Sequence, residues 1–119
     1  MSKNNVLDLF CGCGGLSHGF IEAGYEVVAG IDHWQDALDT FAFNHTQSKA
    51  IKADLFNVSP KEIAKQLKTT NIDVIIGGPP CQGFSIAGKR LIDDERNQLY
   101  KSFVEFVSYF KPEAFIMEN

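Results

Sequence analysis

The sequence contains no long hydrophobic run, no low-complexity tract and no internal repeat. Its apolar stretches fall short of the roughly 18 residues that a membrane-spanning helix needs, and its first residues lack the apolar centre of a signal peptide. We therefore expect no membrane contact and a cytoplasmic location. With 119 residues, 45% of them hydrophobic, the chain has the size and composition of one compact globular domain.

Cysteine and basic charge are also scarce. The three cysteines argue against a disulfide framework, because an odd number cannot pair completely. Cys11 and Cys13 are one residue apart and have no second ligand pair, so we do not expect a closed zinc site. The net charge is −4, whereas a free-standing module for duplex nucleic acid carries a basic surface. If nucleic acid is the substrate, most of the surface that binds it lies elsewhere.

What the sequence does contain is an alternation of short β-rich apolar runs with segments of helical periodicity, which is typical of a parallel α/β sheet. The expected strands cover residues 6–10, 26–31, 49–52, 73–76 and 114–117. The expected helices cover residues 15–23 and 35–44, a segment from Ser59 through Leu67, and a long helix that ends before Pro112. That last helix carries an apolar stripe that we expect to face the core, formed by Leu99, Phe103, Phe106, Val107 and Phe110. Because the chain stops at the tip of its fifth strand, we interpret it as part of a longer polypeptide.

A glycine-rich turn follows the first strand and precedes the first helix, which is where parallel-sheet proteins bind nucleotides. Its glycines, Gly12, Gly14 and Gly15, depart from the dinucleotide spacing, and a plain strand-to-helix turn is the alternative. Asp32, at the end of the second strand, is placed to accept hydrogen bonds from ribose hydroxyls. Asp54, after the third strand, could meet an adenine amino group. Either carboxylate alone is more often a solvated cap. The glycine-rich turn, Asp32 and Asp54 each follow one of three successive strands, and together they favour a nucleotide-like ligand.

A second loop, residues 77–85, leaves the fourth strand at the edge where open α/β folds place ligands. It carries Cys81 behind two prolines that stiffen the backbone. A lone cysteine is usually a small buried hydrophobe, yet polar neighbours and the loop setting favour a positioned thiol. We expect surface or capping roles for His18, His33 and His45.

The two loops resemble those of a known family. Residues 8–16 (DLFCGCGGL) resemble the first signature motif of the cytosine carbon-5 DNA methyltransferases, and residues 78–85 (GPPCQGFS) resemble their nucleophile motif. Residues 94–99 resemble the segment after that loop, and residues 118–119 resemble the start of the Glu-Asn-Val motif. The resemblance implies a Rossmann-like S-adenosylmethionine-dependent methyltransferase fold that is incomplete here. Residues 1–119 would be the amino-terminal part of the catalytic domain, without the target-recognition region and the carboxyl-terminal motifs.

The resemblance also implies the site residues. Those for S-adenosylmethionine are Phe10, Gly12, Gly14, Gly15, Asp32, His33, Asp54, Leu55, Pro80 and Leu99. The family often has Glu and an apolar or aromatic residue where this chain has Asp32 and His33, with Trp34 one place later, so the adenine-stacking residue stays open. Cys81 would be the nucleophile and Glu118 the acid. The nucleic acid would meet Gln82, Ser85, Lys89 and Arg90, and no metal is implied.

The implied reaction is methylation of carbon 5 of a flipped-out cytosine in double-stranded DNA through a covalent Cys81 adduct. The context would be restriction-modification or epigenetic marking, with a cognate restriction endonuclease as a candidate genetic partner. Two alternatives stay open. One is a transfer RNA cytosine as substrate, and the other is an inactive cofactor-binding fragment or accessory subunit. We expect residues 1–119 alone to be inactive.

Overall fold

A parallel sheet forms the centre of the computed structural model, which describes residues 4–79 and 95–118. The sheet has five strands in the order β3-β2-β1-β4-β5, and all neighbouring pairs are parallel. The strands are β1 (Asn5–Leu9), β2 (Glu26–Asp32), β3 (Lys49–Lys52), β4 (Val74–Gly77) and β5 (Ala114–Met117). The helices are α1 (Gly15–Glu22), α2 (Gln35–Asn44), α3 (Pro60–Ala64) and α4 (Glu95–Phe110). The predicted α/β class is confirmed.

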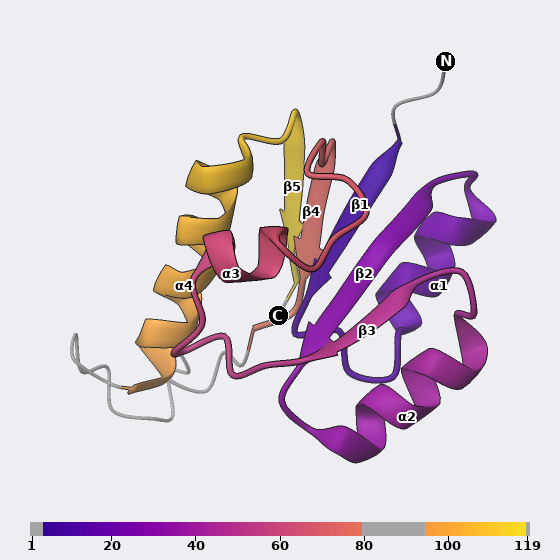
Figure 1. Cartoon of the computed structure of the whole chain (residues 1–119), viewed down its shortest axis with the longest axis horizontal. Coiled ribbons are helices and arrows are strands. Elements are labelled where there is room, and N and C mark those ends of the chain that lie inside the picture. Colours follow the sequence, from indigo (N-terminus) through magenta and orange to yellow (C-terminus); the bar gives the residue numbers. More distant parts are fainter. Residues whose placement is uncertain (1–3, 80–94, 119) are drawn as a thin grey trace.

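Helices cover both faces of the sheet: α1 and α2 lie on one face, and α3 and α4 lie on the other (Figure 1). The chain runs outward from β1 through β2 to β3, and then crosses the sheet to β4 and β5. Because parallel strands are joined by right-handed crossovers, this reversal sends the later helices to the opposite face. The loops after β1 and β4 therefore flank the switch point, where open α/β sheets bind ligands.

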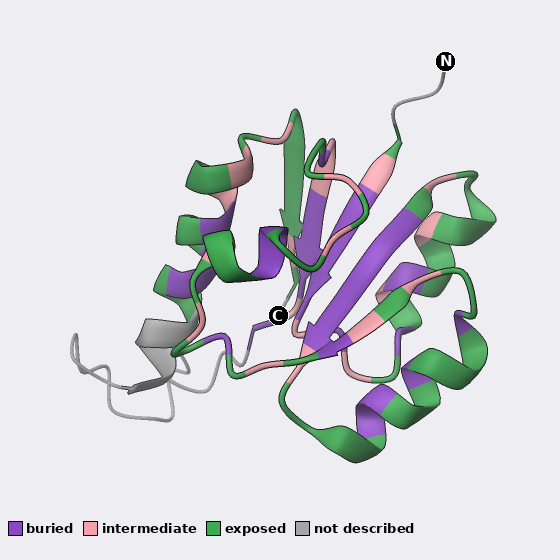
Figure 2. Cartoon of the chain, in the orientation of Figure 1, coloured by how far each residue is buried: buried purple, intermediate pink, exposed green. Residues whose placement is uncertain are grey.

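The core follows the alternation of side chains along the strands. Leu7 and Leu9 of β1 pack into the cluster that contains Phe103 and Phe106 of α4. Val6 faces the other way, into the cluster that contains Phe41 of α2. The central strands are largely buried, whereas β5 at the edge is mostly exposed (Figure 2).

The predicted apolar stripe of the last helix is confirmed as core where the structure describes its side chains. Phe103 and Phe106 are fully buried, and Val107 and Phe110 pack partly buried against the same cluster. The side chain of Leu99 lies outside the described residues. No helix in the described part of the chain is long and apolar enough to cross a membrane.

Several predicted boundaries differ from those observed by one residue or more, and two of the differences have identifiable reasons. The first strand ends at Leu9 because Phe10 has a φ of 58°, which an extended strand does not allow. The helix predicted through Leu67 ends at Ala64. Beyond it the amide of Leu67 donates to the Ala64 carbonyl three residues back at 3.2 Å, so the last turn tightens. Leu67 still reaches the core, partly buried.

Candidate active site

The glycine-rich turn after β1 is sharply bent and open on one side. Phe10, Gly12 and Gly14 have φ values of 58°, 56° and 96°, and the Gly14 amide donates to the Cys11 carbonyl at 3.0 Å. A methyl group built on Gly12 or on Gly15 would meet no atom within 4 Å. The turn therefore exposes backbone at the start of α1, in a place where a ligand could approach closely.

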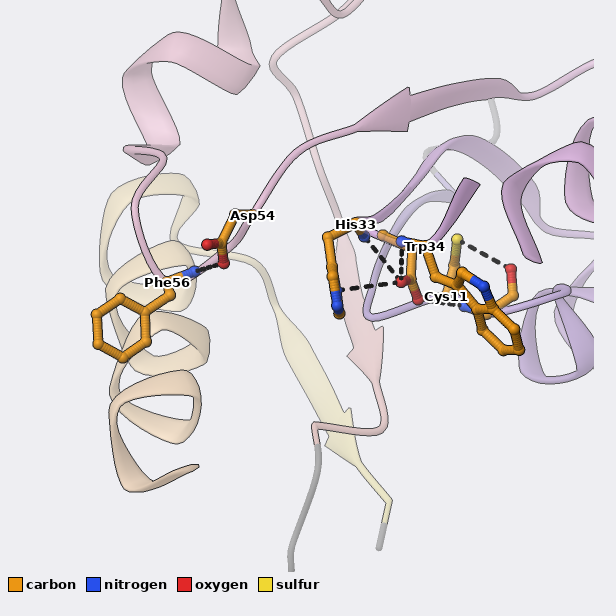
Figure 3. Close-up of polar contacts among 7 residues, drawn as sticks. Cys11, His33, Trp34, Asp54 and Phe56 are labelled. Carbon is orange, nitrogen blue, oxygen red and sulfur yellow. Dashed lines mark hydrogen bonds and ion pairs between the residues drawn. The ribbon is translucent and has the colours of Figure 1, made fainter. Parts of the chain in front are cut away.

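Asp32, at the end of β2, is bonded to this turn. Its Oδ2 atom accepts a hydrogen bond from the Gly12 amide at 2.8 Å, and its Oδ1 atom accepts from the amides of His33 at 2.8 Å and Trp34 at 3.1 Å (Figure 3). A carboxylate offers about four acceptor positions, so capacity remains for one more donor. Asp32 thus holds the turn, a role that we did not predict, and can still serve as a ligand acceptor.

The aromatic residues beside Asp32 are open to solvent. The side chain of His33 is 76% exposed, with its Nδ1 atom 3.6 Å from Asp32 Oδ1. Trp34 is 62% exposed. Both therefore leave a ring face free at the sheet edge, and the choice between them as a stacking residue stays a prediction.

Asp54 follows β3, at the carboxyl ends of the strands, and lies apart from His33 and Trp34 (Figure 3). Its carboxylate accepts from the Phe56 amide at 2.9 Å and from the Asn57 side chain at 2.8 Å. The Leu55 side chain is only 3% exposed and belongs to the core, so it offers little surface to a ligand. Phe56, which is 42% exposed, presents more apolar surface at this place and was not predicted.

Two buried ionisable groups, Asp8 and Cys11, lie at the turn. Asp8 Oδ2 accepts a hydrogen bond from Ser17 Oγ at 2.5 Å, which joins β1 to α1. Burial raises the pKa of Asp8 to about 7; the Ser17 hydrogen bond opposes this rise and the charge of Asp32 adds to it. Burial, with help from Asp8 and Asp32, also raises the pKa of the Cys11 thiol well above its usual range. Cys11 therefore stays protonated at neutral pH and is unsuited to be a nucleophile.

Glu118 lies beside the segment that leads from β4 to residue 81. Its amide donates to the Gly77 carbonyl at 2.9 Å. A methyl group on Gly78 would come within 3.2 Å of Glu118 Oε1, and one on Gly77 would come within 2.3 Å of the Leu9 carbonyl oxygen. The two glycines thus let the chain pass between the ends of β1 and β5. The predicted position of Glu118 beside β4 is confirmed.

The structure brings the turn, Asp32 and Glu118 to one edge of the sheet, and it leaves Asp54 at that edge without contact to the turn. Six predicted residues cannot be compared, because Pro80, Cys81, Gln82, Ser85, Lys89 and Arg90 lie outside the described residues, and the same holds for the side chain of Leu99. Within the described part, no group of three or more His, Cys, Asp or Glu side chains could hold a metal ion.

Comparison with known proteins gives consistent matches. The family model for C-5 cytosine-specific DNA methylases matches residues 4–119. The type II methyltransferase M.DdeI of Desulfomicrobium norvegicum is 44% identical over 115 residues, which cover 97% of this chain and 27% of that protein. M.HgiGI of Herpetosiphon aurantiacus, also a type II methyltransferase, is 44% identical over 114 residues, which cover 96% of this chain and 88% of that protein.

Solved structures show the same fold. An Escherichia coli prophage protein assigned as a DNA modification methyltransferase aligns with a TM-score of 0.77 and 42% identity, over 91% of this chain and 29% of that one. The Dnmt2 methyltransferase of Schizosaccharomyces pombe aligns with a TM-score of 0.66 at 24% identity, over 88% of this chain and 32% of that one, and supports the fold alone. The predicted methyltransferase fold is confirmed, and the chain spans about a third or less of the length of these structures.

Proposed function

This chain belongs to the C-5 cytosine-specific DNA methylase family, and on that premise we propose that it is the amino-terminal part of the catalytic domain of a DNA (cytosine-5)-methyltransferase. The observation that carries the proposal is the meeting of the glycine turn, Asp32 and Glu118 at one edge of the sheet. The target-recognition region and the last motifs would lie outside residues 1–119.

The turn suits S-adenosylmethionine as the cofactor. The space beside Gly12 and Gly15 is open, so a ligand can approach the backbone of the turn there. We assign Phe10, Gly14 and these two glycines to its wall, and the free acceptor position of Asp32 to the ribose hydroxyls. The remaining assigned contacts are Asp54, Pro80, Leu99 and the exposed ring of His33 or Trp34, whereas the buried Leu55 side chain is left out. When bound, the cofactor supplies an electrophilic methyl group.

The reacting groups would be Cys81 and Glu118. Carbon 5 of cytosine is a weak nucleophile, so a thiolate from Cys81 adds to carbon 6 and makes the ring an enamine. Glu118 meets ring nitrogen 3, where charge arrives, and stabilises it. After methyl transfer, loss of the proton from carbon 5 and departure of the thiolate restore the aromatic ring. The buried thiol of Cys11 is unsuited to this step.

We propose double-stranded DNA as the substrate, with the cytosine flipped out of the helix at a cost of a few kcal/mol. Gln82, Ser85, Lys89 and Arg90 would meet the nucleic acid. DNA is favoured over transfer RNA because the family model and the prophage relative both have DNA methylation in their names. The type II names of the relatives support a restriction-modification context, with a restriction endonuclease as genetic partner. A cytoplasmic location is part of the proposal.

The test is a methylation assay with the full-length enzyme and labelled cofactor. We expect Cys81→Ser to abolish methyl transfer and leave DNA binding intact, because the thiolate adds covalently but contributes little to affinity. Duplex containing 5-fluorocytosine should form a stable covalent complex with the wild-type enzyme only, since fluorine cannot leave as a proton does. Glu118→Gln should also lose activity, whereas Glu105→Gln, on the exposed side of α4, should not. Adduct formation by the Cys81→Ser variant would contradict the proposal.

A further inference from the structure

His45 is a buried histidine at the carboxyl end of α2. It follows the last residue of α2, where its amide donates to the Phe41 carbonyl at 2.8 Å. The residue is 6% exposed, and its ring lies against the Phe41 ring with centroids 4.7 Å apart. We expected a surface or capping role for His45. The surface role is wrong because the residue is buried, and capping of α2 accounts for its backbone but does not explain the direction of its ring.

The ring reaches the glycine turn. The Nε2 atom of His45 lies 3.1 Å from the Gly14 carbonyl oxygen, 31 residues away in sequence. A carbonyl oxygen only accepts, so the proton must be on Nε2, and His45 donates this hydrogen bond. The same oxygen accepts from the His18 amide at 2.9 Å, the first hydrogen bond of α1. His45 therefore holds the peptide at which the turn becomes a helix.

Among the described residues, no side chain caps the amides at the start of α1. Gly14 is the N-cap residue of α1 in the left-handed conformation, it provides no side-chain cap, and the first turn of α1 has no acidic residue. The contact is also tight, because a methyl group on Gly14 would come within 2.3 Å of His45 Nε2 and 2.8 Å of the Phe41 ring. The inner side of the turn thus packs on His45, whereas its outer side, at Gly12 and Gly15, is open.

We infer that His45 is a positioning residue for the cofactor turn, and this inference rests on the proposed use of that turn. Asp32 holds the Gly12 amide and His45 holds the Gly14 carbonyl, so the turn is fixed at two points two residues apart. Because these peptides are fixed before the cofactor binds, less conformational entropy is lost on binding. His45 acts through the Gly14 carbonyl.

The test compares His45→Leu, which fills the space without a donor, with His45→Gln, whose amide can reach the same carbonyl. In the full-length enzyme we expect His45→Leu to raise the Kd and KM for S-adenosylmethionine about five- to tenfold, the effect of one lost buried hydrogen bond. The value of kcat at saturating cofactor should change less than about twofold. His45→Gln should restore most of the affinity. The control is Glu22→Gln, an exposed side chain of α1 that has no hydrogen bond or ion pair with the turn or with the His45 ring.

A second readout needs no cofactor and no activity. Hydrogen exchange of the Gly14 and His18 amides should be faster in His45→Leu and return toward the wild-type rate in His45→Gln. If wild-type enzyme neither binds the cofactor nor methylates DNA, the proposed function fails, and exchange still reports whether His45 holds the turn. Unchanged exchange and affinity in His45→Leu would overturn the inference. Equal losses in the Leu and Gln variants would also overturn it, because they would reveal a packing role alone.

Discussion

The buried carboxyl group of Asp8 gives the fold a pH dependence that one substitution should remove. Asp8 is 1% exposed, and burial raises its pKa from 3.8 to about 7. The native state therefore holds this proton more tightly than the unfolded chain does. The stability that the protonated group contributes is fully present below about pH 4 and is lost as the pH rises to about 7. Asp8→Asn keeps an oxygen to accept the Ser17 hydroxyl and does not ionise.

The magnitude follows from linkage. One pKa unit corresponds to about 1.4 kcal/mol, and most of the change in protonation falls between the two pKa values. From pH 5 to pH 8 the wild-type free energy of unfolding should fall relative to that of Asp8→Asn by roughly 2–3 kcal/mol. Urea unfolding followed by circular dichroism at both pH values measures this difference. Asp36→Asn, an exposed substitution in α2, is the control and should track the wild type. Parallel stability curves for wild type and Asp8→Asn would refute the reasoning.

The remaining predictions concern binding, packing and completeness. Asp32→Ala should lower the affinity for S-adenosylmethionine at least about tenfold, because it removes the ribose acceptor and frees the Gly12 amide. Calorimetric titration measures this, and DNA affinity should stay nearly unchanged. Equal cofactor affinity would make Asp32 only a strand-end cap. Gly77→Ala should lower the Tm by the several degrees that correspond to about 1–3 kcal/mol of overpacking, since its new methyl group would lie 2.3 Å from the Leu9 carbonyl; an unchanged Tm would mean that the sheet shifts freely there. Residues 1–119 alone should incorporate no tritium from labelled cofactor into duplex DNA, because catalysis needs all reacting groups held together, and Cys81-dependent incorporation would show that they suffice.

The fold could be predicted from the sequence because each strand and helix has its own local signal. The helix at residues 35–44 and the strand at residues 49–52 were predicted with their observed bounds, because polar turns separate their apolar patterns. Errors came where a single backbone angle decides the boundary. Phe10 has a positive φ, which cannot be predicted from a phenylalanine. The conformation is required by the position of Phe10 just before the glycine turn.

The site was predicted less completely because its contacts join residues that are distant in sequence. Asp32 was identified from its place at a strand end, but its bond to Gly12, 20 residues away, depends on how β1 and β2 pair. His45 carried no motif, and its bond to Gly14 depends on the packing of α2 beside α1. Leu55 was assigned to the ligand from the family resemblance, whereas its side chain is buried in the core.

The position of Glu118 shows how sheet register determines a site. Gly77 of β4 pairs with Met117 of β5, and the Gly77 carbonyl accepts from the Glu118 amide. A slip of one residue would turn the Glu118 side chain to the other face, because side chains alternate along a strand. Ile75 is fully buried at the middle of β4 opposite Phe115, which packs edge-on against Phe103 of α4. This contact with α4 opposes such a slip, so the placement of the proposed acid depends on the core of the sheet as well as on the residues around Glu118.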